Sequence, residues 1–220
     1  MAERDGTLKE RVGSDGSKPK LPHPILGLAA LFSGAALVAA VWFQLPLAVT
    51  LLCTGLFAGV AVMTRYSSLD TPGRRDTLLR LRSGLKAGIV ATLAYDLWRL
   101  GLVEFADFPI SPFESFRLFG LSILGPNATE FLAYLVGTMY HLLNGLTFSV
   151  AYVLLFRMPN PFTGIAWALG LEAAMFTVYP GWMDLEAVMM EFTVMSLSGH
   201  LVYGALLGVL GRKFLVAAKS

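Results

Sequence analysis

The sequence predicts an all-α membrane protein that crosses the bilayer about six times. Of its 220 residues, 55% are hydrophobic and only 15% are charged, whereas ordinary soluble domains are roughly 25% charged. Several apolar runs approach or exceed the length of about 18 to 20 residues that a helix needs to cross a bilayer. The charged residues are gathered mainly between these runs. Together these observations predict a polytopic membrane protein.

The expected transmembrane helices are six apolar segments: residues 25–43, 46–64, 84–103, 131–156, 162–179 and 192–210. The first two are joined by a short turn and form an N-terminal hairpin over residues 25–64. The last four are expected to form a four-helix membrane core over residues 84–211. Two start signals support this division. Asn127 and Glu130 have the spacing of a capping box, and Asn160 precedes a proline at the first helical position.

The distribution of basic residues predicts the orientation. Fifteen of the 17 Lys and Arg residues lie on one side of the membrane if both termini share that side, and only Arg99 and Arg117 lie on the other. Because Lys and Arg concentrate in cytoplasmic loops, we expect the inner, or plasma, membrane of a cell with both termini in the cytoplasm. The cytoplasmic parts are then a disordered tail over 1–24, a basic linker over 65–83 and a C-terminal tail over 212–220.

The longest loop on the opposite side covers residues 104–129. Within it, Ser111 and Glu114 have capping-box spacing around Pro112, and apolar residues then recur on one face. This pattern predicts a short amphipathic helix at the membrane interface. Such a helix is either a lid over a cavity or a connector that lies on the membrane.

Four ionisable side chains lie deep inside the last four apolar segments: Asp96, His141, Glu172 and His200. Each is nine to twelve residues from the start of its segment. A rise of about 1.5 Å per residue therefore puts all four near the middle of a core about 30 Å thick. Each also lies in a row of small residues spaced four apart, where membrane helices approach closely. Equal depth and a shared facing direction predict that the four side chains meet at one site.

Four further side chains are expected beside this site, one turn or less away along the same helices: Tyr95, Arg99, Asn144 and Tyr203. Arg99 is the only permanent cation among them. Because it follows Asp96 by three residues, it can pair with that carboxylate along the helix. In that case the site would shrink to two histidines and one glutamate.

Three functions fit this set of residues. Two imidazoles with one or two carboxylates suit zinc, iron or manganese, which predicts a metal-dependent membrane enzyme or a metal-handling protein. Asp, Glu and His inside membranes also carry protons, and histidine ordinarily titrates near neutral pH, which favours a proton-coupled transporter of a small molecule or cation. The third function is a non-catalytic scaffold or assembly subunit, in which the polar contacts only hold helices together. The residue pattern leaves all three open.

The motif His-Leu-x-x-Gly occurs twice, at residues 141–145 and 200–204. Each histidine segment follows a segment that carries an acid, so the four-helix core is also predicted to be a duplicated hairpin. The sequence contains no phosphate-binding loop, dinucleotide fingerprint or nucleophile elbow. The expected partners are bilayer lipids and either a second membrane protein or further copies of the chain, with no nucleic acid.

Overall fold

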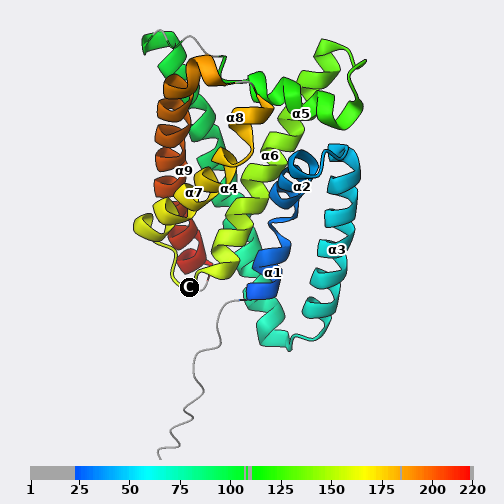
Figure 1. The fold of residues 1–220 in the computed structure, drawn as a ribbon. Coiled ribbons are helices and arrows are strands. Elements are labelled where there is room, and N and C mark those ends of the chain that lie inside the picture. Colours follow the sequence, from blue (N-terminus) through cyan, green and yellow to red (C-terminus); the bar gives the residue numbers. More distant parts are fainter. Residues whose placement is uncertain (1–22, 107, 109–110, 184, 219–220) are drawn as a thin grey trace, which may run out of the picture.

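The computed structural model describes residues 23–106, 108, 111–183 and 185–218, and this part of the chain consists of helices and turns without strands. The predicted all-helical class is therefore confirmed. The predicted disordered tail falls almost wholly on residues 1–22, which lie outside the described part. Figure 1 shows the arrangement of the helices, which are α1 (Pro24–Ala29), α2 (Phe32–Trp42), α3 (Leu47–Ser67), α4 (Thr71–Ala106), α5 (Glu114–Leu124), α6 (Glu130–Leu155), α7 (Pro161–Phe176), α8 (Tyr179–Trp182), the 3-10 turn η1 (Glu186–Val188) and α9 (Met189–Ala217).

Three helices of the described part are long and apolar enough to cross a membrane: α3, α6 and α9. Helices α2 and α7 are also apolar but have only 11 and 16 residues. At about 1.5 Å per residue, each is shorter than a hydrocarbon core of about 30 Å. The structure thus supports a membrane protein with three candidate spanning helices, and the count of six spans stays a prediction.

The first predicted span, residues 25–43, is wrong as a single helix. The chain forms α1 and α2 there, with a turn at Ala30 and Leu31. No proline lies in this segment, so the break has no strong local signal. Both pieces pack against α3 and α6, α2 mainly against α3.

The third predicted span belongs to a longer helix. α4 runs for 36 residues, so most of the basic linker 65–83 and all of the span 84–103 form one continuous helix. Pro72 lies in its first turn, where proline is tolerated, and no other proline follows until Pro109. As a result, one continuous helix carries both the charged residues of the linker and Asp96 of the predicted site.

The starts of α6 and α7 test the two predicted caps. Asn160 caps α7 as predicted, because its side chain accepts a hydrogen bond from the backbone N of Thr163 at 3.0 Å. The prediction for α6 was wrong by two residues. The cap there is Thr129, whose hydroxyl accepts from the backbone N of Leu132, and not Asn127.

The predicted amphipathic helix of the loop 104–129 is α5, but it begins at Glu114 without a side-chain cap, so the capping box expected from Ser111 does not form. α5 packs closely on α6 rather than only lying on the surface. Phe116 and Phe119 are buried in this contact. A side chain at Gly120 would overlap the backbone of α6, which explains why the helix approaches so closely there.

Helices α4, α6, α7 and α9 form the core of the bundle. α4 packs against α6 and α9, and α9 also packs against α7. Glycine permits the closest approach, since a side chain at Gly164 of α7 would overlap the backbone of Gly204 and Gly208 on α9. In Figure 1 the described chain ends lie at one end of this bundle, called here the tail end. α5 and α8 lie at the opposite end, called here the cap end.

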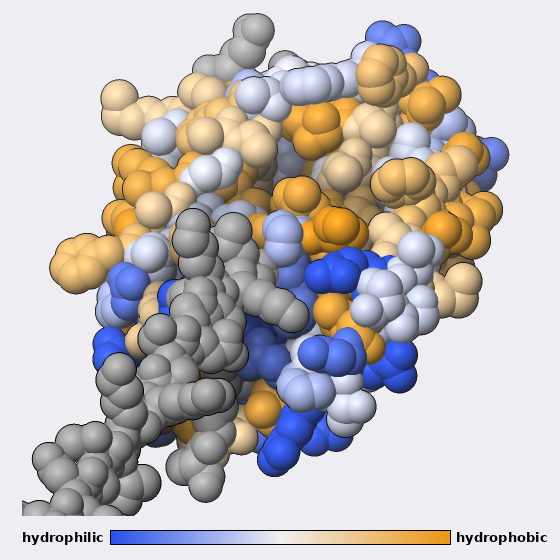
Figure 2. All heavy atoms as spheres, turned by 90° about the horizontal axis from the view of Figure 1, so that it is seen from below, coloured by the Kyte–Doolittle hydropathy of each residue, from blue (hydrophilic) through white to orange (hydrophobic). Residues whose placement is uncertain are grey.

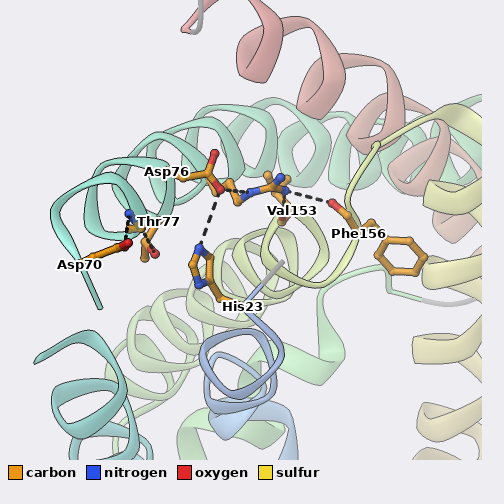
Figure 3. A network of polar contacts seen from close by, with 8 residues as sticks. His23, Asp70, Asp76, Thr77, Val153 and Phe156 are labelled. Carbon is orange, nitrogen blue, oxygen red and sulfur yellow. Dashed lines mark hydrogen bonds and ion pairs between the residues drawn. The ribbon is translucent and has the colours of Figure 1, made fainter. Parts of the chain in front are cut away.

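A buried arginine joins α4 to the last turn of α6 at the tail end (Figure 3). Arg80 is 5% exposed and donates through Nη1 to the carbonyl oxygens of Val153 at 2.8 Å and Phe156 at 3.1 Å. The last four carbonyls of a helix lack partners within the helix, and a cation near them is favourable. Arg80 therefore holds α4 and α6 in register below the candidate site.

Candidate functional site

The four ionisable side chains predicted to meet form two histidine–carboxylate pairs in the middle of the bundle. His141 on α6 lies against Asp96 on α4, with its Nε2 3.0 Å from Oδ1 and 3.1 Å from Oδ2. His200 on α9 lies against Glu172 on α7, with its Nδ1 2.8 Å from Oε2. Glu172 is only 2% exposed. Each pair thus falls within one of the two predicted hairpins, and the duplication itself stays a prediction.

The surroundings of His200 define which of its nitrogens carries a proton. Nδ1 lies 3.0 Å from the backbone oxygen of Ser196 as well as close to Glu172. A carbonyl oxygen can only accept a hydrogen bond, so Nδ1 is the donor. This leaves Nε2 as the atom that can bind a further partner. The hydroxyl of Ser196 also donates to Glu172 Oε2 at 2.9 Å, which holds the carboxylate in place.

Tyr95 connects the two pairs. Its ring centroid lies 6.1 Å from that of His141 and 5.1 Å from that of His200. Both separations are within or close to the range in which aromatic rings interact favourably. Because Tyr95 directly precedes Asp96 on α4, one turn of this helix contributes to both pairs.

Arg99 does not remove Asp96 from the site. Its Nη1 is 3.9 Å from Asp96 Oδ1, whereas His141 Nε2 is 3.0 Å away from the same oxygen. The guanidinium lies over the ring of Tyr95, 5.1 Å from its centroid, and donates through Nη2 to the carbonyl of Pro112. The nearest ionisable partner of Asp96 is therefore the histidine.

A cavity of about 100 Å³ lies beside the two pairs. One water molecule needs about 10 to 15 Å³ of such space, so the cavity has room for several waters or a small polar molecule. Its lining includes both imidazoles but neither carboxylate, which means that each carboxylate lies behind its histidine. The polar residues that line it are Thr92, Tyr95, Arg99, Ser111, Ser115, His141, Asn144, Tyr179, Ser196, His200 and Tyr203.

Several buried polar atoms around the cavity have no hydrogen-bond partner within the described part of the chain. They include Thr92 Oγ1, Arg99 Nε and Asn144 Oδ1 on the lining, and Glu172 Oε1 behind it. Most buried polar atoms in proteins are paired, so unpaired ones call for an explanation. Here three of them belong to side chains that line the cavity.

The cavity extends toward the cap end and stops on the tail side at Tyr203. Toward the cap end the cavity reaches α5 and α8, where Phe119 and Tyr179 line it. Toward the tail end Tyr203 closes it, because its hydroxyl lies 2.7 Å from Ser149 Oγ and donates to the carbonyl of Gly145 at 3.0 Å. Below Tyr203 follows the close contact of α7 and α9.

A second cavity, of about 300 Å³, adjoins the first between α2 and α7. Its walls are almost entirely apolar. Asn144 and His200 line both cavities, so they lie where the apolar space meets the polar one. The polar cavity therefore continues toward the cap end on one side and meets an apolar cavity between α2 and α7 on the other.

The metal hypothesis is not favoured by this arrangement. Within the described ranges, no group of three or more His, Cys, Asp and Glu side chains is placed so that it could hold a metal ion. Catalytic zinc sites generally use three protein ligands, whereas two imidazoles face this cavity. Binding of zinc, iron or manganese stays a prediction.

Two residues that contribute to the candidate site were not predicted from the sequence. Ser196 was not among the predicted site residues, although it lies one turn before His200 and donates to Glu172. Phe116 was expected on a surface helix, yet its ring centroid lies 4.4 Å from that of His141. A hydroxyl four residues before a histidine is a signal that could have been used for Ser196. The contact of Phe116 depends on how α5 folds over α6, for which the sequence holds no local signal.

Comparisons of this chain with protein-family models, with curated protein sequences and with solved structures found no match. The chemistry available to the site is that of its own side chains. Two imidazoles, each backed by a carboxylate, can exchange protons with a molecule in the cavity, while a phenol, an amide and hydroxyls can orient it by hydrogen bonds.

Proposed function

We propose that this chain is a proton-coupled transporter of a small polar molecule or cation in the inner, or plasma, membrane of a cell. The observation that carries the proposal is the pairing of two histidines with two carboxylates on four different helices around one cavity. Ionisable residues inside membranes generally face the bundle interior, find partners and mark proton or substrate pathways.

The pairing makes proton uptake inside an apolar bundle feasible. When His200 accepts a proton on Nε2, the resulting imidazolium lies 2.8 Å from the Glu172 carboxylate, so the new positive charge is paired at once. An unpaired charge at this depth would cost several kcal/mol. His141 and Asp96 offer the same pairing on the other side of Tyr95. The proton then passes to the transported molecule or leaves with it.

The two ends of the core suggest how transport would proceed. The cavity extends toward the cap end, and close glycine contacts between α7 and α9 lie on its tail side. Transport requires a second arrangement in which the cap end closes over the cavity and the tail end opens. Phe116 on α5 contacts His141. A movement of α5 would therefore change the surroundings of this proton-binding imidazole.

The proposed orientation has both termini in the cytoplasm. Figure 2 views the tail end and shows hydrophilic residues gathered on part of it. Exposed basic residues at this end include Arg74, Arg75, Arg157, Arg212 and Lys213. Because Lys and Arg concentrate on the cytoplasmic side, the cavity would open to the outside of the cell.

Proteoliposomes that enclose a pH-sensitive dye test the proposal. A gradient of Na⁺, K⁺ or a small amine is imposed, and the internal pH is followed. We expect a solute-dependent proton flux that Glu172→Gln and Asp96→Asn abolish, since each amide keeps the shape but cannot stabilise an imidazolium. Glu104→Gln is the matched control, because Glu104 is exposed at the end of α4, and it should retain the flux. Equal fluxes in all four proteins would refute the proton-coupled function.

A further inference from the structure

A third cavity lies at the tail end, away from the histidine pairs, between α3 and α4. It has a volume of about 650 Å³, within the range of about 300 to 1,000 Å³ that is usual for ligand sites. Although α3 and α4 follow each other in the chain, α3 packs on α1, α2 and α5 and only weakly on α4. The space between them forms a groove whose floor is made by α1 and α6.

The interior of this groove suits an apolar occupant. α4 contributes Leu78, Leu81 and Leu85, and α3 contributes small residues such as Gly55 and Gly59. A side chain added at Gly59 would meet no atom within 4 Å. The lining therefore offers van der Waals contact along its length and open space in the middle.

The two threonine hydroxyls on the lining are already paired. Thr77 donates to the carbonyl of Gly73 at 2.9 Å, and Thr147 Oγ1 lies 2.8 Å from Ser33 Oγ. An occupant that brought polar groups into the middle of the groove would bury them without partners at a considerable cost. The chemistry of the interior is therefore that of a hydrocarbon chain.

The tail-end rim of the groove is basic. Tyr66 lines the groove, and the guanidinium of Arg74 lies 5.6 Å from the centroid of its ring. Arg65 is close by and donates to the hydroxyl of Ser68 at 3.0 Å. Arg75 is exposed next to Arg74. The acidic residue of this turn, Asp70, accepts a hydrogen bond from Gly73 N. Against the three arginines Arg65, Arg74 and Arg75 it leaves the rim with an excess of positive charge.

A helix does not fit between α3 and α4 near this rim. Ser67 ends α3 and Thr71 begins α4, so four Cα steps of about 3.8 Å keep these ends within about 15 Å of each other. A helix packed between them would need about 16 to 20 Å between the two axes, which is twice the usual packing distance. A flexible hydrocarbon chain does not need this separation between the axes of α3 and α4.

From these observations we infer that the groove binds an anionic phospholipid. One acyl chain lies between α3 and α4, and the phosphate lies at the rim formed by Arg65, Arg74 and Arg75. This lipid site is independent of the proposed transport function, because it shares no lining residue with the cavity beside the histidine pairs. Basic residues next to the cytoplasmic face of a membrane attract anionic lipids in this way.

Native mass spectrometry of the full-length protein tests the inference after reconstitution in nanodiscs of equal phosphatidylglycerol and phosphatidylcholine. We expect one retained lipid with a clear preference for phosphatidylglycerol. Gly59→Phe fills the groove and should lose this lipid. Gly170→Phe is the matched control, because Gly170 of α7 is exposed and an added side chain there also meets no atom within 4 Å.

A double variant tests the rim and does not depend on the groove-filling change. Arg74→Gln with Arg75→Gln should keep a bound lipid but lower the preference for phosphatidylglycerol by roughly 10- to 25-fold, because each arginine near an anionic headgroup contributes roughly a fivefold preference. Equal retention of lipid in Gly59→Phe and Gly170→Phe would overturn the inference. Retention of both lipids without preference, or a change of oligomeric state in Gly59→Phe, would overturn it as well.

Discussion

Two clusters of buried polar side chains lie on the same long helix, one at the tail end and one in the middle of the bundle. In the tail-end cluster, Arg80 donates to Asp76 at 2.7 Å and to the carbonyls of Val153 and Phe156, and His23 lies 3.7 Å from Asp76 (Figure 3). The guanidinium thus donates to three acceptors. Two of them are carbonyls at the C-terminal end of α6, where a cation is favourable.

The cluster in the middle of the bundle is paired less completely. Arg99 is also buried, yet its Nε has no partner in the described chain and its carboxylate neighbour Asp96 is 3.9 Å away. Thr92 and Asn144, which also line the cavity, each have a buried oxygen without a partner in the described chain. The comparison separates two uses of buried polarity. Where protein groups satisfy one another the cluster holds helices together, and where donors and acceptors stay unpaired beside a cavity it is suited to binding.

The largest effect is expected from Arg80→Leu. This change removes the donor of two helix-terminal carbonyls, and leaving a buried acceptor unsatisfied costs about 1 to 3 kcal/mol. Thermal unfolding in detergent, followed by circular dichroism, measures the loss. Arg82→Leu is the control, since Arg82 is exposed on the same helix and its loss should change stability by no more than about 0.5 kcal/mol. Similar losses in both variants would remove the structural role assigned to the tail-end cluster.

A smaller effect is expected when divalent metal is added or removed. A metal bound at 100 times its dissociation constant would stabilise the fold by about 2.7 kcal/mol. Because two imidazoles alone face the cavity, we expect zinc to leave the melting temperature nearly unchanged and a chelator to have no effect. Metal analysis of the purified protein should give a substoichiometric content that is the same in His141→Ala and His200→Ala.

One result would reverse the ranking of the metal and proton hypotheses. Stoichiometric zinc, iron or manganese that is lost in both histidine variants would show that the site collects further ligands when metal is present. The mid-bundle cluster would then be a metal centre, and the flux experiment with Glu172→Gln would have to be interpreted through metal loss.

The smallest effect concerns pH at the tail end. Burial lowers the pKa of His23 below its ordinary value of 6.5, and the nearby Asp76 carboxylate opposes this only in part. The unfolded chain therefore binds the proton more readily than the folded one, so stability should rise with pH from the lowered pKa to about 6.5 and level off above it. Melting temperatures of the wild type and His23→Asn, compared across this range, measure the contribution. A wild-type protein that gains stability relative to the variant on acidification would contradict the sign.

Local sequence signals predicted some of these features and missed others. Asn160 before a proline predicted the start of α7, because capping depends on residues that are adjacent in the chain. The same kind of signal failed at Asn127, where Thr129 two residues later is the cap, and at Ser111, where α5 begins without a side-chain cap. The break between α1 and α2 was also missed, since no proline or other strong local signal marks it.

The sequence by itself determined that the chain is helical and suited to a membrane, and it predicted that four ionisable side chains lie at similar depth on small-residue faces. These properties depend on segment length and on helical periodicity, which each segment carries alone. Only the tertiary structure decided that Asp96 pairs with His141 rather than Arg99, that Tyr95 lies between the two pairs and that the carboxylates lie behind the imidazoles. Such contacts depend on the order and rotation of helices around one another, and these are properties of the whole bundle.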